Sequence, residues 1–401
     1  MTAQTTTRVS TGAVQQSDHE ARHRVHLPAY ETVALILQGG GTLGAYQAGI
    51  YEGLSEAGIA PNWIAGISIG ALNAAIIAGN APENRVQRLR EFWNTLCEPA
   101  YTNPFLSFIE QTMFDTTDDI RKMLTHLNVA YTVQNGQKGF FTTRIPSPWI
   151  TGSRDPKTVS YYDTAPLKTT LERLCDFDRI NAQETRVSVG AVNINTGNFC
   201  YFDNTKMKLR AEHFMASGAL PPGFAAIEID GQFYWDGGLV SNTPLSEVLQ
   251  TSPRRDTLAF QVDLWNALGE VPTHIDAVGA RVKDIQYSSR TRFVTDSLNR
   301  SQHYRRLLHE VLKAVPTELK QTDRWCKLAE KVACGKRYNV VHLIYRNKAY
   351  ETEYKDIQFS MPIMHAHWQS GLDDIRHTFK QDDWLDMPNN DSGFVTHDIH
   401  R

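Results

Sequence analysis

The chain has 401 residues, a formal net charge of −3, and a composition that is 41% hydrophobic and 21% charged. This length allows two or three domains with a large core, and the near-neutral charge excludes a general polyanion binder, so we expect no nucleic-acid partner. Five scattered cysteines favour free thiols in a reducing compartment. Residues 1–30 lack the apolar core of a signal peptide, and no apolar run approaches the length of a membrane span. We therefore expect a flexible N-terminal tail over 1–30 and a cytoplasmic protein.

The first motif is a glycine loop. An apolar run at 33–37 predicts a strand buried on both faces, and a helix is expected over about 45–57. The connection, Gly39-x-Gly41-x-x-Gly44, can turn bare backbone N–H groups toward an anion. It formally matches a pyrophosphate loop, but the next strand does not end in the acidic residue that would hold a ribose. We favour the other anion chemistry, an oxyanion hole for acyl transfer.

The second motif is a serine turn. The apolar run at 63–67 passes into Gly66-x-Ser68-x-Gly70, and a helix of small residues follows at 71–79. A serine on such a sharp strand-to-helix turn stands clear of the sheet at the positive end of a helix, and the glycines relieve the crowding. This arrangement is typical of a nucleophile.

The middle of the chain carries less information. An amphipathic helix is expected over 83–98, and a hairpin over 187–202 with its turn at 195–198. Between them, 99–162 is rich in aromatic residues, Pro and Thr, including Phe105, Phe108, Phe114, Phe140, Phe141 and Trp149. This position suits a lid or an acyl-chain pocket, and an insertion that only packs the core fits the composition equally well.

The third motif is Asp236-Gly237-Gly238, which follows a predicted hairpin at 227–235 that turns at Asp230-Gly231. Alone, such a carboxylate is usually a turn residue or a helix cap. Three ordered motifs are more specific. With the glycine loop at 39–44 and the serine turn, the chain resembles the patatin-like phospholipases, a family of serine lipid acyl hydrolases, over about 32–250. Family-like context also appears at 216–221 and 242–245.

The resemblance implies a three-layer α/β fold with a mostly parallel central sheet flanked by helices. It places a catalytic domain at 31–265, with the possible lid or pocket insertion at about 99–162. It implies a dyad of Ser68 as nucleophile and Asp236 as base, without metal or cofactor. The oxyanion hole would use backbone N–H groups of Gly39, Gly40, Gly41 and Thr42. The other motif residues are Gly44, Gly66, Gly70, Gly237 and Gly238.

One position departs from the family pattern. Many members carry Arg or Lys two residues after the glycine triplet, where this chain has Leu43, so any role of that cation is in doubt. The dyad itself is chemically reasonable, because a carboxylate base has no tautomer to fix and so needs no third member. An ordinary Asp is a feeble base, so the site must raise its pKa by desolvation.

The substrate is expected to be a lipid or another acyl ester, and three alternatives remain. A Ser-Asp-His triad would draw its base from His274, His303, His309, His342, His365 or His367. None of these lies in a recognisable loop motif, and a metal site at His365 and His367 lacks further ligands. A storage polyester or a thioester could replace the lipid ester. A catalytically silent lipid-binding protein is the contrasting class.

The C-terminal part is expected to be an α/β extension at 266–386, followed by a frayed end at 387–401. It begins with a long basic helix at 276–314, for which we favour a solvated face or an oligomer contact over a membrane surface. A strand at 338–346 could extend the main sheet, and 375–384 looks helical. These features leave a homo-oligomer open, and the protein would touch the inner membrane only peripherally.

Overall fold

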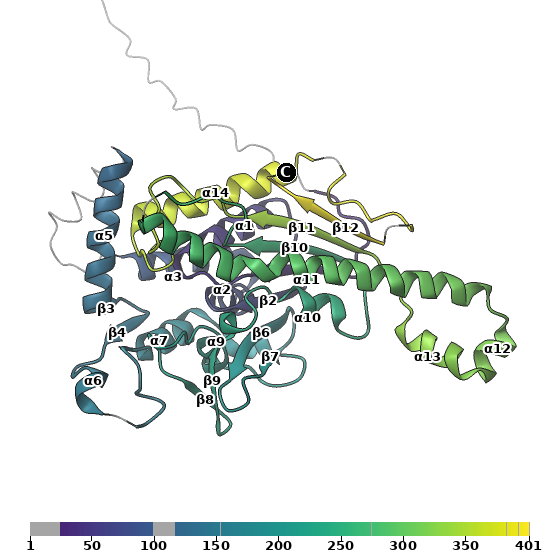
Figure 1. The fold of residues 1–401 in the computed structure, drawn as a ribbon, viewed down its shortest axis with the longest axis horizontal. Coiled ribbons are helices and arrows are strands. Elements are labelled where there is room, and N and C mark those ends of the chain that lie inside the picture. The colour runs from purple at the N-terminus through teal and green to yellow at the C-terminus, as the bar shows by residue number, and fades with distance from the viewer. Residues whose placement is uncertain are drawn as a thin grey trace, which may run out of the picture.

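The computed structural model describes residues 25–98, 117–152, 154–273, 275–381, 383–391 and 393–400. Within them a nine-stranded, mostly parallel sheet has the order β12-β11-β10-β1-β2-β6-β9-β8, with β7 paired to β6 (Figure 1). Its strands are β1 Thr32–Leu37, β2 Trp63–Ile67, β6 Arg186–Asn193, β7 Phe199–Asp203, β8 Ile227–Ile229, β9 Gln232–Asp236, β10 Thr257–Asp263, β11 Tyr338–Ile344 and β12 Phe394–Asp398. The expected tail at 1–30 lies outside the described residues over 1–24. It is wrong over 25–30, where Val25, Leu27 and Tyr30 pack against the core and the Val25 N–H donates to the Ala57 carbonyl oxygen at 3.1 Å.

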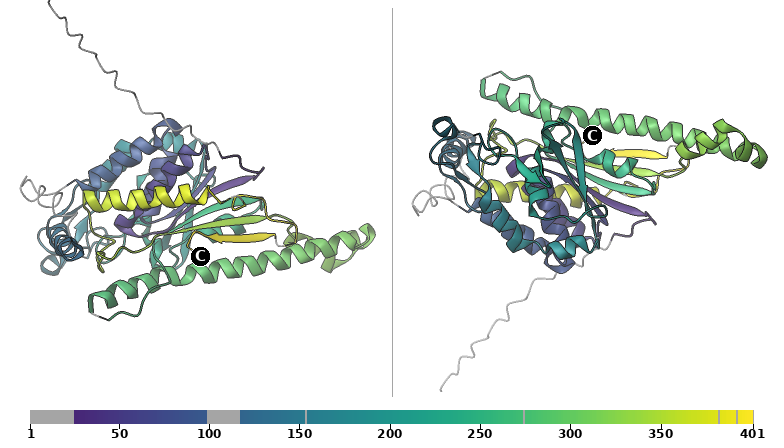
Figure 2. Two further views of the ribbon diagram at one scale, coloured as in Figure 1. Left: turned by 90° about the horizontal axis from the view of Figure 1, so that it is seen from above. Right: turned by 90° about the horizontal axis from the view of Figure 1, so that it is seen from below.

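Helices cover both faces of this sheet. On one face lie α1 Gly44–Glu56, α2 Ile69–Ala78, α3 Arg85–Cys97, α7 Ala165–Leu174, α8 Phe177–Asn181, α9 Ala211–Ser217 and α14 Met361–Thr378. The other face carries α10 Leu245–Gln250 and α11 Ile275–Ala314, and Figure 2 shows α11 and α14 on opposite sides of the sheet. The three-layer α/β fold predicted from the sequence is confirmed.

Strand β1 shows how the sequence builds these layers. Leu35 and Leu37 join the core on the α1 side, whereas Ala34 and Ile36 join the core on the α10 side, and all four are fully buried. Alternate residues of a strand point to opposite faces, so a run that is apolar at every position can fill two cores at once. The central position of β1 follows from this pattern.

The predicted hairpins and most predicted helices are present. Strands β8 and β9 pair around Asp230-Gly231, and β6 pairs antiparallel with β7. The described part of the 99–162 insertion forms α5 Asp118–Asn135, α6 Pro148–Thr151 and a small sheet of β3 Gly136–Gln137, β4 Phe141–Thr143 and β5 Tyr162–Asp163. Phe105, Phe108 and Phe114 lie outside the described residues.

The C-terminal extension is built into the main sheet. β11 pairs parallel with β10, and β12 pairs parallel with β11. The expected frayed end at 387–401 is therefore wrong over Phe394–Asp398. β12 is a short edge strand with Thr, His and Asp after its first residues, so its pattern is not strongly apolar; Phe394 packs against Tyr338 with ring centroids 6.0 Å apart. The helix expected at 375–384 is the end of α14, which begins at Met361 and ends at Thr378.

α14 lies directly against α1, because glycines on both helices remove the side chains between them. A Cβ atom on Gly49 would lie 2.0 Å from the Trp368 carbonyl oxygen, and one on Gly371 would lie 2.1 Å from the Tyr46 carbonyl oxygen. The end of the chain is thus packed against the helix that follows the glycine loop.

The long helix α11 continues beyond the body of the protein and carries α12 Thr317–Thr322 and α13 Arg324–Val332 at its far end (Figure 1). The expected basic helix at 276–314 is present as α11. No helix in the part of the chain that the structure describes combines the length and apolarity needed to cross a bilayer.

Candidate active site

Ser68 sits between the end of β2 and the start of α2, with φ 54° and ψ −123°. This strained conformation is the sharp turn predicted from the motif. The flanking glycines leave no room for side chains: a Cβ atom on Gly66 would lie 2.5 Å from the carbonyl carbon of Gly70, and one on Gly70 would lie 2.3 Å from the Leu37 carbonyl oxygen. The hydroxyl of Ser68 therefore stands at the positive N-terminal end of α2.

Asp236, the last residue of β9, lies beside this serine. β9 pairs antiparallel with β6, the neighbour of β2, and this order brings the third motif to the second. The Ser68 hydroxyl donates a hydrogen bond to the Asp236 carboxylate, and the Gly238 N–H donates to Asp236 Oδ1 at 2.7 Å. Burial raises the pKa of Asp236 to about 6, against the lowering effect of these two hydrogen bonds.

The glycine loop lies next to Ser68, but its four predicted donors are not equivalent. The Gly39 N–H faces the Asn242 carbonyl oxygen at 3.4 Å, and the Thr42 N–H donates to the Asp356 carbonyl oxygen at 3.0 Å. The Thr42 N–H is already bonded within the protein, so it cannot also donate to an oxyanion, and Thr42 does not belong to the predicted oxyanion hole. The Gly39 N–H is also turned toward a protein acceptor, although its hydrogen bond is long. Among the described residues, the N–H groups of Gly40 and Gly41 have no protein acceptor.

The structure also locates the departure at position 43. The Leu43 side chain is fully buried in the core between the sheet and its helices. Where many family members carry Arg or Lys, this chain thus has a buried, uncharged side chain that offers no cation to the loop or to a substrate.

A cavity of about 300 Å³ opens over Ser68 and Asp236. Its wall is mainly apolar. Besides the glycine loop and the start of α2, it includes residues of the insertion, of the 220–224 loop and of the C-terminal extension. Aromatic rings pack together in this wall, with ring centroids of Phe141 and Phe224 5.3 Å apart and those of Phe140 and Phe359 5.8 Å apart. Phe140, Phe141 and Tyr162 of the insertion thus line the cavity, and Phe141 also packs in the hydrophobic core.

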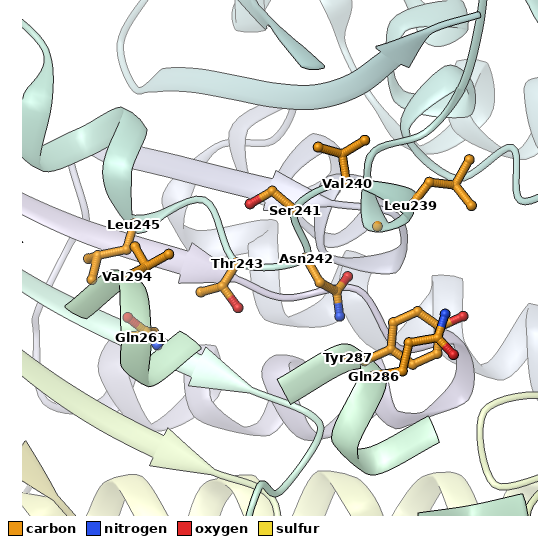
Figure 3. Close-up of a pocket in the computed structure, with 11 residues that line it drawn as sticks. Leu239, Val240, Ser241, Asn242, Thr243, Leu245, Gln261, Gln286, Tyr287 and Val294 are labelled. Atoms are coloured by element: carbon orange, nitrogen blue, oxygen red, sulfur yellow. The ribbon is translucent and has the colours of Figure 1, made fainter. Parts of the chain in front are cut away.

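A smaller polar pocket of about 90 Å³ adjoins the cavity through Gly238, Asn242 and Tyr287, which line both. Figure 3 shows Tyr287 and Gln286 on one side of this pocket and the 239–243 loop on the other. Tyr287 belongs to α11, so the extension contributes to both spaces.

Several residues that shape the site could not be identified from the motifs. Ser217 accepts a hydrogen bond from the Ser68 N–H, Asn242 Nδ2 donates to the Gly39 carbonyl oxygen, and Trp265 Nε1 donates to the same oxygen. Ser217 and Asn242 lie in the family-like stretches at 216–221 and 242–245. Trp265 and Asp356 carry no local signal.

No described histidine lines the cavity. His367 is fully buried; its Nε2 lies 2.9 Å from Glu351 Oε1 and its Nδ1 lies 3.4 Å from the Thr42 carbonyl oxygen. His342 lies against Asp263, with Nδ1 3.5 Å from Oδ2. His274 falls outside the described residues. Asp236 is thus the ionisable side chain that bonds to Ser68, and no described histidine lies in the cavity beside it.

A serine turn, a buried aspartate and a glycine loop thus meet at one edge of a mostly parallel sheet, which is the arrangement that the resemblance to the patatin-like phospholipases implies. Sequence profiles agree: residues 35–249, more than half of the chain, match the family Patatin, described as patatin-like phospholipase. Residues 285–391 match DUF3734, described as patatin phospholipase. The chain belongs to the patatin-like phospholipase family. No curated protein matches it.

Solved structures give distant likenesses. VipD from Legionella pneumophila is 13% identical with a TM-score of 0.38, and the match covers 92% of this chain and 72% of that one. The type III effector ExoU is 14% identical with a TM-score of 0.30, and the match covers 88% and 54% of the two chains. At such identities and TM-scores, neither structure bears on the residues or the substrate of this chain.

Proposed function

We propose that this protein hydrolyses carboxylic esters of lipids, phospholipids among them, through an acyl-enzyme on a dyad of Ser68 and Asp236. The observation that carries this proposal is the hydrogen bond between the serine hydroxyl and a buried carboxylate whose pKa is raised to about 6. An ordinary Asp carboxylate is too weak a base for a serine hydroxyl, and burial is the standard means of strengthening it.

In the first half-reaction, Ser68 Oγ attacks the ester carbonyl carbon while Asp236 accepts the hydroxyl proton. The N–H groups of Gly40 and Gly41 hold the oxyanion, aided by the dipole of α2. Collapse of the tetrahedral intermediate breaks the bond to the alcohol oxygen, and Asp236 returns its proton to that leaving group. Loss of one such oxyanion donor typically lowers kcat by about 10²- to 10³-fold.

In the second half-reaction, Asp236 removes a proton from water as the water oxygen attacks the acyl carbon. The intermediate then expels Ser68 Oγ, which regains the proton, and the free acid leaves. The polar pocket beside Gly238 and Asn242 is the side from which water can approach, because the main cavity is walled by apolar groups.

The cavity supports a hydrophobic acyl group as the bound part of the substrate. Each methylene group of an acyl chain that is buried against this aromatic wall would make binding more favourable by about 0.8 kcal/mol. This preference fits fatty acyl esters, and it also admits storage polyesters and acyl thioesters. We expect only weak, peripheral contact with a lipid surface, for which the exposed Trp325 on α13 and the neighbouring Arg324 are available.

The test is covalent labelling with a fluorophosphonate probe, followed by peptide mass spectrometry. We expect the adduct on Ser68 in the wild type, none in Ser68→Ala, and full labelling in Ser55→Ala, which changes an exposed serine on α1. Turnover is then measured on phospholipids, short acyl esters, a hydroxyacid polyester and a thioester. An adduct on another serine of active protein would overturn the dyad. Neither adduct nor turnover, with retained lipid binding, would favour a silent lipid-binding protein.

A further inference from the structure

Thr42, the residue that follows the glycine triplet, bonds to the C-terminal extension through each of its polar groups. Its N–H donates to the Asp356 carbonyl oxygen at 3.0 Å, and its Oγ1 donates to the Lys355 carbonyl oxygen at 2.5 Å. Its carbonyl oxygen faces His367 Nδ1 at 3.4 Å. The side chain of Thr42 is buried, so these contacts are shielded from water.

The loop that receives Thr42 is itself held from inside the protein. Lys355 is almost completely buried, and its Nζ donates to Asp284 Oδ1 at 2.6 Å and to Asn347 Oδ1 at 2.7 Å. Asn347 Nδ2 closes the triangle by donating to Asp284 Oδ2 at 3.0 Å. A buried charge that is paired and hydrogen-bonded fixes its surroundings, because any displacement would leave it unpaired in a medium of low polarity.

A second ion pair ties the same loop to α11. Lys283 Nζ lies 2.7 Å from Asp356 Oδ1 and also donates to the Glu353 carbonyl oxygen at 2.8 Å. The backbone carbonyl oxygen of Asp356 is the acceptor for Thr42. That carbonyl oxygen therefore belongs to the second of two adjacent residues, Lys355 and Asp356, whose side chains are both held by ion pairs.

Gly41 shows how closely the two segments fit. It has φ +56°, and a Cβ atom there would lie 1.9 Å from the Asp356 carbonyl oxygen. Backbone therefore packs on backbone at the residue whose N–H faces the proposed oxyanion. Small displacements of such a group have large effects, because a donor stabilises the transition state only where the charge develops.

We propose that the 351–367 segment of the extension holds the oxyanion loop in its active shape, with Thr42 and Lys355 as positioning residues. The expected effect on turnover rests on the proposed function, whereas the anchoring of the loop by the 351–367 segment is independent of it. The extension then contributes to the active site in two ways: it positions the oxyanion loop, and it lines part of the cavity. In this proposal it supplies no group that contacts the reacting atoms.

The first test is kinetic and uses the full chain. Thr42→Val keeps the shape of the side chain and removes the bond to Lys355, so we expect kcat to fall about 10- to 100-fold with little change in KM. Thr42→Ser keeps the hydroxyl and should restore most of the loss. The control is Thr378→Val, which removes a comparable bond from a buried threonine to the Asp374 carbonyl oxygen on α14. Unchanged kcat in Thr42→Val, or an equal fall in the control, would overturn the proposal.

The second test follows hydrogen–deuterium exchange and needs no substrate. Thr42→Val, and the double variant Lys355→Met with Asp284→Asn, should speed exchange in peptides covering 38–46 and leave peptides covering β2 unchanged. The double variant removes both charges together, so it leaves no buried charge unpaired. Unchanged exchange at 38–46 in folded variants would contradict the anchoring. A wild type without Ser68 labelling or turnover would instead contradict the proposed function, whatever the exchange shows.

Discussion

Ser217 Oγ accepts a hydrogen bond from the Ser68 N–H at 2.9 Å and donates one to the Gly190 carbonyl oxygen at 2.6 Å. The strained turn at Ser68 is thereby tied to β6 through a single buried hydroxyl. Asp236 is paired with Ala191, the next residue of β6. One strand therefore sets the position of the proposed nucleophile and of its base.

Ser217→Ala should lower kcat by about tenfold or more, because it leaves the Ser68 N–H unpaired and frees the turn to relax. Steady-state kinetics and the rate of fluorophosphonate labelling both measure this effect. Ser55→Ala is the matched control on an exposed helix face. Wild-type labelling rates in Ser217→Ala would show that the turn holds its shape without this bond.

The activity should rise with pH through the pKa of Asp236. Only the ionised carboxylate can accept the serine proton, so kcat/KM should fall about tenfold per pH unit below about pH 6 and level off above it. The measurement is a pH profile with a soluble ester. Asp236→Asn should remove most turnover, whereas Asp230→Asn, at the exposed tip of the same hairpin, should keep the profile. An acid limb near pH 4 would contradict the raised pKa.

The same carboxylate should destabilise the fold at neutral pH. The pKa of Asp236 is about 6 in the folded protein, whereas an unperturbed Asp side chain, as in the unfolded chain, has a pKa of 3.8. Between these two pH values the folded state therefore binds more protons than the unfolded state. The contribution of this group to the free energy of unfolding is therefore most favourable below about pH 4. It decreases by about 3 kcal/mol as the pH rises to 6 and above. Asp236→Asn should raise Tm at pH 8 and have little effect near pH 4, as measured by thermal unfolding. A lower Tm at pH 8 would contradict this.

Gly41→Ala should abolish turnover, because the new methyl group would overlap the Asp356 carbonyl oxygen and displace the loop. Gly152→Ala is a close control: Gly152 also has φ +56°, and nothing lies within 4 Å of its Cβ position. The control should cost only about 1 kcal/mol of backbone strain and leave kcat unchanged. Kinetics and thermal unfolding of both variants separate the overlap from the strain. Equal losses in the two would assign the effect to strain alone.

The sequence predicted the local part of the site and missed its long-range part. The turn at Ser68 and the glycine loop are each encoded by neighbouring residues, since glycines and apolar strands act over a few positions. The engagement of the Thr42 N–H could not be predicted in this way, because its acceptor, Asp356, is far along the chain and acts through its backbone. The same reason hid Ser217, whose hydroxyl resembles any other until the fold brings it to the turn.

The fold divides in the same manner. Strands that are buried on both faces, such as β1 and β2, have a continuous apolar run, and the sequence analysis located them. β12 is a short edge strand with polar residues, so its pairing with β11 depends on the sheet already being present. The α1–α14 contact depends on Gly49 and Gly371, two single glycines whose meeting no local pattern indicates.

The shared sheet determines what can be removed from this protein. In a chain that ended at 265, all seven buried residues of β10 would lose their pairing with β11. β10 would then become an unpaired edge strand, open to pairing with other chains. We therefore expect the catalytic part and the extension to unfold in one cooperative transition and to yield no stable fragment on limited proteolysis near 265. By the same reasoning we expect the two matched regions to fold as one unit, and an insertion or a fusion to be better tolerated at the α12–α13 end of α11.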